Sequence, residues 1–151
     1  MGLLERLGDE LKESMRAGNH AKVSVIRLVK SSIKNKEIDK RAPLTEDEIL
    51  DIIMSGIKQG RESVDQFRKG GREDLVQKET GEIEILQTFL PKPLTQQELE
   101  SEIKLVIKEV GAMSPQDMGK VMRALMPRVR GRAEGTKVNS VVKEIMGSLV
   151  H

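Results

Sequence analysis

Residues 45–67 have the sequence TEDEILDIIMSGIKQGRESVDQF, and its pattern predicts a long amphipathic helix. Thr45 and Glu48 form a capping box, in which each side chain accepts a hydrogen bond from the backbone N–H of the other residue. After this box, apolar residues return to one face at helical spacing, and charged residues occupy the opposite face. The apolar positions are Ile49, Ile53, Ile57, Val64 and Phe67. We expect the helix to end near Gly70-Gly71.

Other segments show the same period, and the five prolines (Pro43, Pro91, Pro93, Pro115 and Pro127) separate them. A proline inside a helix removes a backbone donor and clashes with the preceding turn, so we expect these prolines between helices. No sustained alternation of apolar and polar residues predicts a strand. The sequence therefore predicts an all-α, multihelical protein. The apolar positions of its further helices are Leu4, Leu7, Leu11 and Met15; Val25, Ile26, Val29 and Ile33; Leu86, Phe89 and Leu90; Leu99, Ile103, Val106 and Val110; Met118, Val121, Met122 and Leu125; and Val138, Val141, Val142, Ile145 and Leu149.

The segment Pro91-Lys92-Pro93 is the expected domain boundary, because a Pro-x-Pro segment is extended and stiff. It divides the chain into two small helical subdomains. Residues 1–92 would form an N-terminal subdomain of about four helices, and residues 93–151 a C-terminal subdomain of about three to four helices.

Composition excludes several classes of protein. The chain of 151 residues has no Cys, which excludes disulfides and a cysteine nucleophile. Its formal net charge of +2 is too small to indicate a protein that binds nucleic acid over its whole surface. Phe67 and Phe89 are its only aromatic residues, which argues against modules that stack unpaired bases on aromatic rings. Charged residues appear too early for a secretory signal peptide, and no run of 18 apolar residues exists. We therefore expect a soluble cytoplasmic protein without a membrane segment.

Catalytic and metal-binding patterns are missing from the sequence. His20 lies near a helix start and His151 is terminal, so no metal-ligand spacing is present. Gly119-Lys120 lacks the other residues of a phosphate-binding loop. We expect no catalytic residue, no metal and no cofactor. Gly56 and Gly60, one turn apart in the long helix, are interpreted as a site where a neighbouring helix approaches closely.

Two basic features are candidates for nucleic-acid contacts. The first, which we call the 27–34 stripe, is a set of three cations at positions i, i+3 and i+7 of one helix: Arg27, Lys30 and Lys34. The second is the segment 118–132, which has five cations and no acid: Lys120, Arg123, Arg128, Arg130 and Arg132. We expect the three arginines to follow the helix as a flexible, exposed loop. Spaced guanidinium groups suit phosphate binding, although both features are also compatible with ordinary solvated charge.

The segments Asp117 to Met122, Gly131 to Gly135 and Val138-Asn139 resemble the GatB/YqeY family, as do Leu3 to Leu7 and Ser24 to Lys30. The similarity covers essentially the whole chain. The last two segments also resemble the stand-alone YqeY-like members of the family. It implies two helical subdomains. A related domain forms the C-terminal tail of the B subunit of tRNA-dependent amidotransferase, where it contacts tRNA while other domains perform the chemistry.

The resemblance implies a tRNA-binding or tRNA-metabolism accessory protein that recognises folded RNA by shape and phosphate. Met118, Gly119, Val121 and Met122 would then shape the supporting helix rather than touch RNA. One alternative is a helical adaptor that docks to an amidotransferase or an aminoacyl-tRNA synthetase. Another is carbon–nitrogen ligase activity with glutamine as amide donor, for which the chain has no visible catalytic set.

Overall fold

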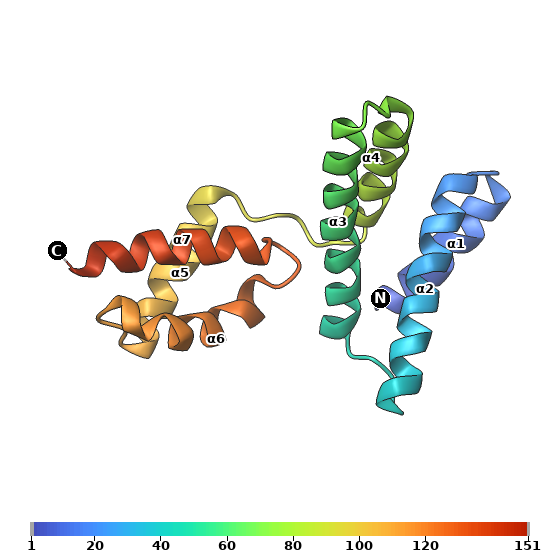
Figure 1. Cartoon of the computed structure of the whole chain (residues 1–151). Coiled ribbons are helices and arrows are strands. Elements are labelled where there is room, and N and C mark those ends of the chain that lie inside the picture. The colour runs from blue at the N-terminus through green and yellow to red at the C-terminus, as the bar shows by residue number, and fades with distance from the viewer. Residues whose placement is uncertain (1, 151) are drawn as a thin grey trace. The chain divides into compact units, whose positions relative to one another are not determined.

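The computed structural model describes residues 2–150, except for the side chain of Val150, and it contains seven α-helices and no strand within that range (Figure 1). The predicted all-α, multihelical class is confirmed. The chain divides into two compact units, residues 1–90 and 91–151. Each unit has its own apolar core.

The N-terminal unit consists of α1 (Leu3–Arg16), α2 (His20–Lys40), α3 (Glu46–Lys69) and α4 (Glu73–Gln87). Leu3 and Leu7 are buried on the inner face of α1. Leu4 and Met15, which were expected on that face, are about half exposed. Four apolar residues of α2 enter the core as predicted: Val25, Ile26, Val29 and Ile33. The predicted capping box of Thr45 with Glu48 is present, and Thr95 with Glu98 forms a second one in the C-terminal unit.

A tertiary contact caps α1. Its own N-cap residue, Gly2, supplies no side chain, and the backbone N–H of Leu3 donates instead to Glu46 Oε1 at 2.7 Å. Glu46 lies in the first turn of α3, so one carboxylate joins the starts of two helices. This satisfies a backbone donor that a helix start otherwise leaves unpaired.

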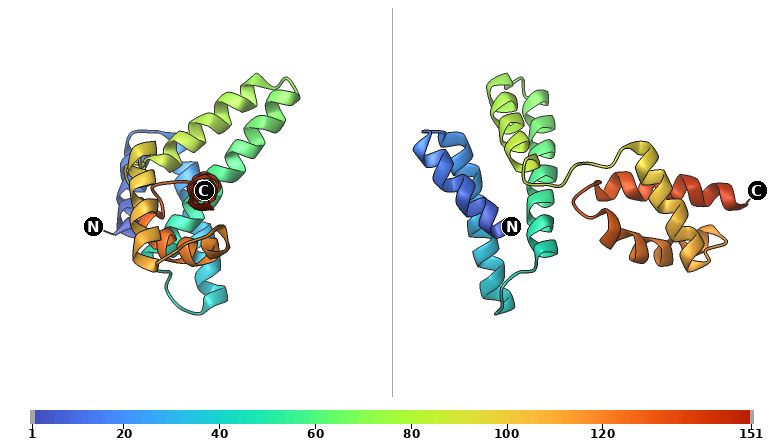
Figure 2. Two further views of the ribbon diagram at one scale, coloured as in Figure 1. Left: turned by 90° about the vertical axis from the view of Figure 1, so that its left-hand side faces the viewer. Right: turned by 180° about the vertical axis from the view of Figure 1, so that it is seen from behind.

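Close approach of α3 and α4 is built on two glycines. The helices lie side by side in both views of Figure 2. A Cβ atom added to Gly60 would lie 2.8 Å from Ile83 Cγ1, and one added to Gly56 would lie 3.2 Å from Leu86 Cδ1. The interpretation of these glycines as helix-packing positions is confirmed.

The C-terminal unit consists of α5 (Gln96–Val110), a 3₁₀ turn η1 (Pro115–Asp117), α6 (Met118–Val129), α7 (Gly135–Gly147) and a second 3₁₀ turn η2 (Ser148–Val150). Gly111, with φ of 69°, ends α5 in the left-handed conformation that favours glycine. Buried aliphatic side chains from the three α-helices form the core of this unit.

Replacing Gly60 by Ala should destabilise the protein, because the new methyl group collides with Ile83. Overpacking of this kind costs about 1–3 kcal/mol, which exceeds the gain of up to about 1 kcal/mol in helix propensity. Gly81→Ala is the matched control, since its added Cβ meets no atom within 4 Å and should stabilise α4. Urea unfolding of both variants measures the difference; equal free energies of unfolding would refute the close-packing argument.

Glu48 makes part of the stability pH-dependent. Its hydrogen bond with Lys40, followed by that with the Thr45 backbone, lowers its pKa from 4.5 to about 2. A carboxyl whose folded-state pKa is depressed stabilises the fold above its unfolded pKa and loses this contribution as the pH falls. The difference in unfolding free energy between wild type and Glu48→Gln should therefore shrink between about pH 4.5 and pH 2. Denaturant titrations at several pH values check this, and a constant difference would contradict it.

Candidate nucleic-acid interface

The start of α6 is fixed by Asp117. Its Oδ2 accepts the backbone N–H of Met113 at 2.9 Å, and this hydrogen bond is the main reason why the pKa of Asp117 is lowered. Buried Val121, Leu125 and Val129 form the inner face of the helix. Asp117 thus contributes to the geometry of the turn before α6.

Lys120 and Arg123 lie on the solvent side of α6, and both are exposed. Arg123 Nε reaches back to the Gly119 carbonyl at 3.4 Å, and the charge of Lys120 helps to lower the pKa of Asp117. Neither cation has an ion pair within residues 2–150. Their charge faces solvent, as expected from the sequence.

Arg128 does not belong to a loop, which corrects the prediction. The helix continues to Val129 with Pro127 inside it, so one of the five prolines is not a separator. Pro127 has no backbone N–H to donate to the carbonyl of Arg123 four residues earlier, so the last turn of α6 lacks this one hydrogen bond. Arg128 Nε lies 2.9 Å from Glu102 Oε2 and Nη1 lies 3.2 Å from Glu109 Oε2, both on α5. Its charge is balanced by these two carboxylates.

Arg130 and Arg132 are also not on an exposed flexible loop, because both side chains are half-buried. Arg132 Nε donates to the Lys92 carbonyl at 3.0 Å, and the Arg132 carbonyl accepts the Leu94 N–H at 2.8 Å. The buried Gly131 between the two arginines has a φ of 78°, which is strained for other residues. We call these two hydrogen bonds the 92–132 clasp.

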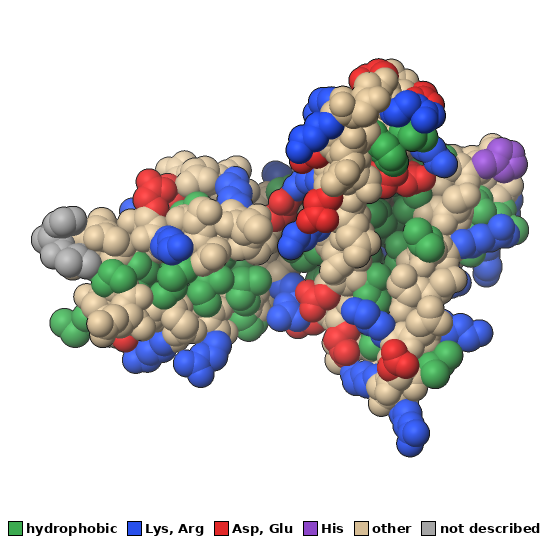
Figure 3. Space-filling view, in the orientation of Figure 1, with side chains coloured by type: hydrophobic (Ala, Val, Ile, Leu, Met, Phe, Trp, Pro, Cys, Tyr) green, Lys and Arg blue, Asp and Glu red, His purple; other side chains and the backbone are tan. Residues whose placement is uncertain are grey.

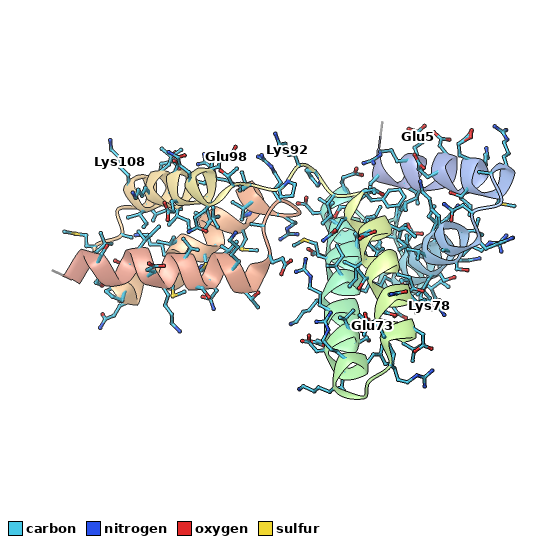
Figure 4. The ribbon with its side chains drawn as sticks, turned by 90° about the horizontal axis from the view of Figure 1, so that it is seen from above. Glu5, Glu73, Lys78, Lys92, Glu98 and Lys108 are labelled. Atoms are coloured by element: carbon cyan, nitrogen blue, oxygen red, sulfur yellow. The ribbon has the colours of Figure 1, made fainter. Side chains whose placement is uncertain are left out.

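Charges around the clasp interact with the start of α5. The pKa of Glu98 is lowered, first by its hydrogen bonds with Thr95 and to a smaller degree by the nearby charges of Arg132 and Lys92. Figure 4 labels Lys92 and Glu98 at this end of the unit. Arg132 therefore acts in the structure of the C-terminal unit, and the five predicted cations do not form one surface.

The 27–34 stripe is on the solvent side of α2. Arg27 and Lys34 are exposed and Lys30 is half-buried, and no ion pair engages any of them among the described residues. Two exposed hydroxyl groups that the sequence analysis did not select, Ser24 and Ser31, lie on the same side. Their seven-residue spacing beside Arg27 and Lys34 is the signal that could have identified them.

Other candidate chemistry is sparse in the described part of the chain. Residues 2–150 contain no group of three or more His, Asp or Glu side chains close enough to hold a metal ion. No helix in this range is long and apolar enough to cross a membrane. His20 begins α2 and is exposed, and His151 lies outside the described residues.

The fold and its basic surfaces define a class: an all-helical protein of two small units that presents isolated patches of positive charge. A family model described as Yqey-like protein matches residues 4–146, and the chain belongs to this family. The predicted resemblance is thereby confirmed.

Curated relatives share the name "Altered inheritance of mitochondria protein 41, mitochondrial". The chain is 43% identical to the Eremothecium gossypii protein over 88 residues, which cover 58% of this chain and 48% of that protein. It is 29% identical to the Pyrenophora tritici-repentis protein over an alignment that covers 97% of this chain and 82% of that protein. It is 28% identical to one from Saccharomyces cerevisiae over an alignment that covers 95% of this chain and 68% of that protein. The chain thus spans only about half the length of the first of these relatives.

These names contradict the cytoplasmic location expected from the sequence, because each of the relatives is named as a mitochondrial protein. The expectation was drawn from the composition and from the lack of a secretory signal. Neither property reports on an organelle, since targeting is read from a separate segment rather than from a folded domain.

Reversing the charge of Arg128 should destabilise the C-terminal unit, because Arg128→Glu places a third carboxylate beside Glu102 and Glu109. The side chains of the Arg128–Glu102 ion pair are about one third exposed, so we expect the free energy of unfolding to fall by about 1 kcal/mol or more. Arg123→Glu, with the same charge change on the solvent side of α6, should shift stability by about 0.5 kcal/mol or less. Thermal unfolding compares the two, and equal shifts would argue against the ion pairs.

Proposed function

We propose that this protein is an RNA-binding accessory protein of tRNA metabolism that recognises folded RNA by its shape and phosphates. The observation that carries the proposal is a set of cations on the outer sides of α2 and α6 for which residues 2–150 offer no ion-pair partner. These are Arg27, Lys30, Lys34, Lys120 and Arg123. Each unit thus has its own basic surface.

Phosphate recognition fits this chemistry better than base readout. Double-stranded RNA is bound mainly through its shape, its phosphates and its 2′-hydroxyl groups. The side chains of Arg27 and Lys34 suit phosphates, and the hydroxyl groups of Ser24 and Ser31 can donate to phosphate or accept from a 2′-hydroxyl. With two Phe residues, Phe67 and Phe89, and no Tyr or Trp, the chain has little to stack on unpaired bases.

The resemblance adds support of a different kind. The related tail domain of the amidotransferase B subunit contacts tRNA without taking part in the chemistry, and a binding role needs no catalytic residues. Ligase activity with glutamine as amide donor has no residue in this chain that argues for it. The adaptor role is favoured by a separate feature, an apolar groove of the C-terminal unit.

Reversal of two cations per surface tests the proposal. Arg27→Glu/Lys34→Glu and Lys120→Glu/Arg123→Glu should each weaken tRNA binding, because repulsion replaces the attraction to phosphates. The slope of log affinity against log salt should become shallower by about 0.7–0.9 for each phosphate that the variant no longer neutralises. Filter binding or anisotropy with labelled tRNA at several salt concentrations measures both quantities.

Lys58→Glu/Lys78→Glu is the matched control, because it makes the same change in net charge at exposed positions of α3 and α4. This variant should retain most of the wild-type affinity. If the control weakens binding as much as the two test variants do, the effect is one of net charge only. If wild type does not bind tRNA, the proposal fails.

A further inference from the structure

An open apolar groove lies at one end of the C-terminal unit, where the end of α5 meets the end of α7. Its volume is about 510 Å³, within the range of sites that hold small ligands or side chains of a partner. The apolar lining comes from Ile107, Ala112, Met113, Ile145 and Leu149. Figure 3 shows a different face of this unit, over α7 and α6, where hydrophobic side chains gather in a band with Lys and Arg side chains along its border.

Two of these apolar side chains are exposed. Met113 is 82% exposed and Leu149 is 39% exposed. The flexible, polarisable thioether of methionine adapts to differently shaped partners and is common at binding surfaces. An exposed apolar groove bordered by polar groups is typical of a protein-interaction site.

The charges at the border indicate which partner fits. Lys104 and Lys108 lie one turn apart on α5, both are exposed, and neither has an ion pair within residues 2–150. Among the described residues, no Asp or Glu lines the groove. Figure 4 labels Lys108 toward the far end of α5 from Glu98. A segment with apolar side chains and flanking carboxylates therefore complements the groove in both polarity and charge.

We propose that this groove binds an acidic, apolar peptide segment of a partner protein, with apolar side chains between α5 and α7 and carboxylates on Lys104 and Lys108. The apolar lining disfavours RNA, whose phosphates need water or donors around them. The site is independent of the basic surfaces on α2 and α6. It would give an adaptor role its docking surface.

Selection from a displayed library of random 12-residue peptides tests the proposal on the full chain. Wild type should select sequences rich in Leu, Ile or Phe together with Asp or Glu. Lys104→Glu/Lys108→Glu should reverse the charge preference toward Lys and Arg. Met113→Asp should lower the affinity for a selected peptide by about tenfold or more, as expected for removal of an apolar anchor.

Two controls keep the outcomes distinct. Lys58→Glu/Lys78→Glu should leave peptide affinity unchanged, and Met113→Asp should leave tRNA affinity unchanged, so that the two proposals fail separately. Selection of no groove-dependent peptide, or of peptides without an acidic preference, overturns the proposal. A wild-type dimer that Met113→Asp dissociates would instead assign the groove to a second copy, and binding to anionic phosphatidylglycerol vesicles that Met113→Asp removes would assign it to lipid.

Discussion

The scarcity of aromatic rings constrains this molecule, because both cores have to be closed by aliphatic side chains. Only Phe89 among the aromatic residues is fully buried, at the end of the N-terminal core. Aliphatic side chains fill less space than rings, so helices have to approach closely to leave no void. The contact of Gly60 with Ile83 is the clearest result of this constraint. Arg6 strengthens the same region, since its guanidinium lies 5.5 Å from the centre of the Phe89 ring and donates to the Thr88 carbonyl.

Residues that carry the family resemblance serve the fold of the C-terminal unit. Asp117 holds the turn before α6, Gly131 supplies a left-handed turn, and Arg132 forms the 92–132 clasp. The clasp joins the first residues of the unit to the loop before α7, two segments that are far apart in the sequence. A motif can thus identify a family while its side chains stabilise the fold rather than bind a ligand.

Sequence reasoning predicted the features that depend on local spacing. Capping boxes, buried faces and the small residues of α3 follow from periods of three and four residues. It did not predict the capping of α1 by Glu46 or the pairing of Arg128 with two residues of α5. Both contacts join separate helices, and no local pattern reports them. The helical position of Pro127 was missed for a related reason, since burial of Val129 holds the last turn of α6 in place.

The position of Arg128 also shows why a count of cations does not locate a binding surface. Its side of α6 faces α5, whose carboxylates neutralise it, whereas Lys120 and Arg123 project from a side on which nothing packs within the described unit. The same holds for Arg27 and Lys34 on α2. Charges that project from one packed helix start from fixed backbone positions, so binding has to order only their side chains, at a cost of about 0.5–1.5 kcal/mol for each one immobilised. Recognition by shape requires a rigid surface of this kind, which a flexible arginine loop would not supply.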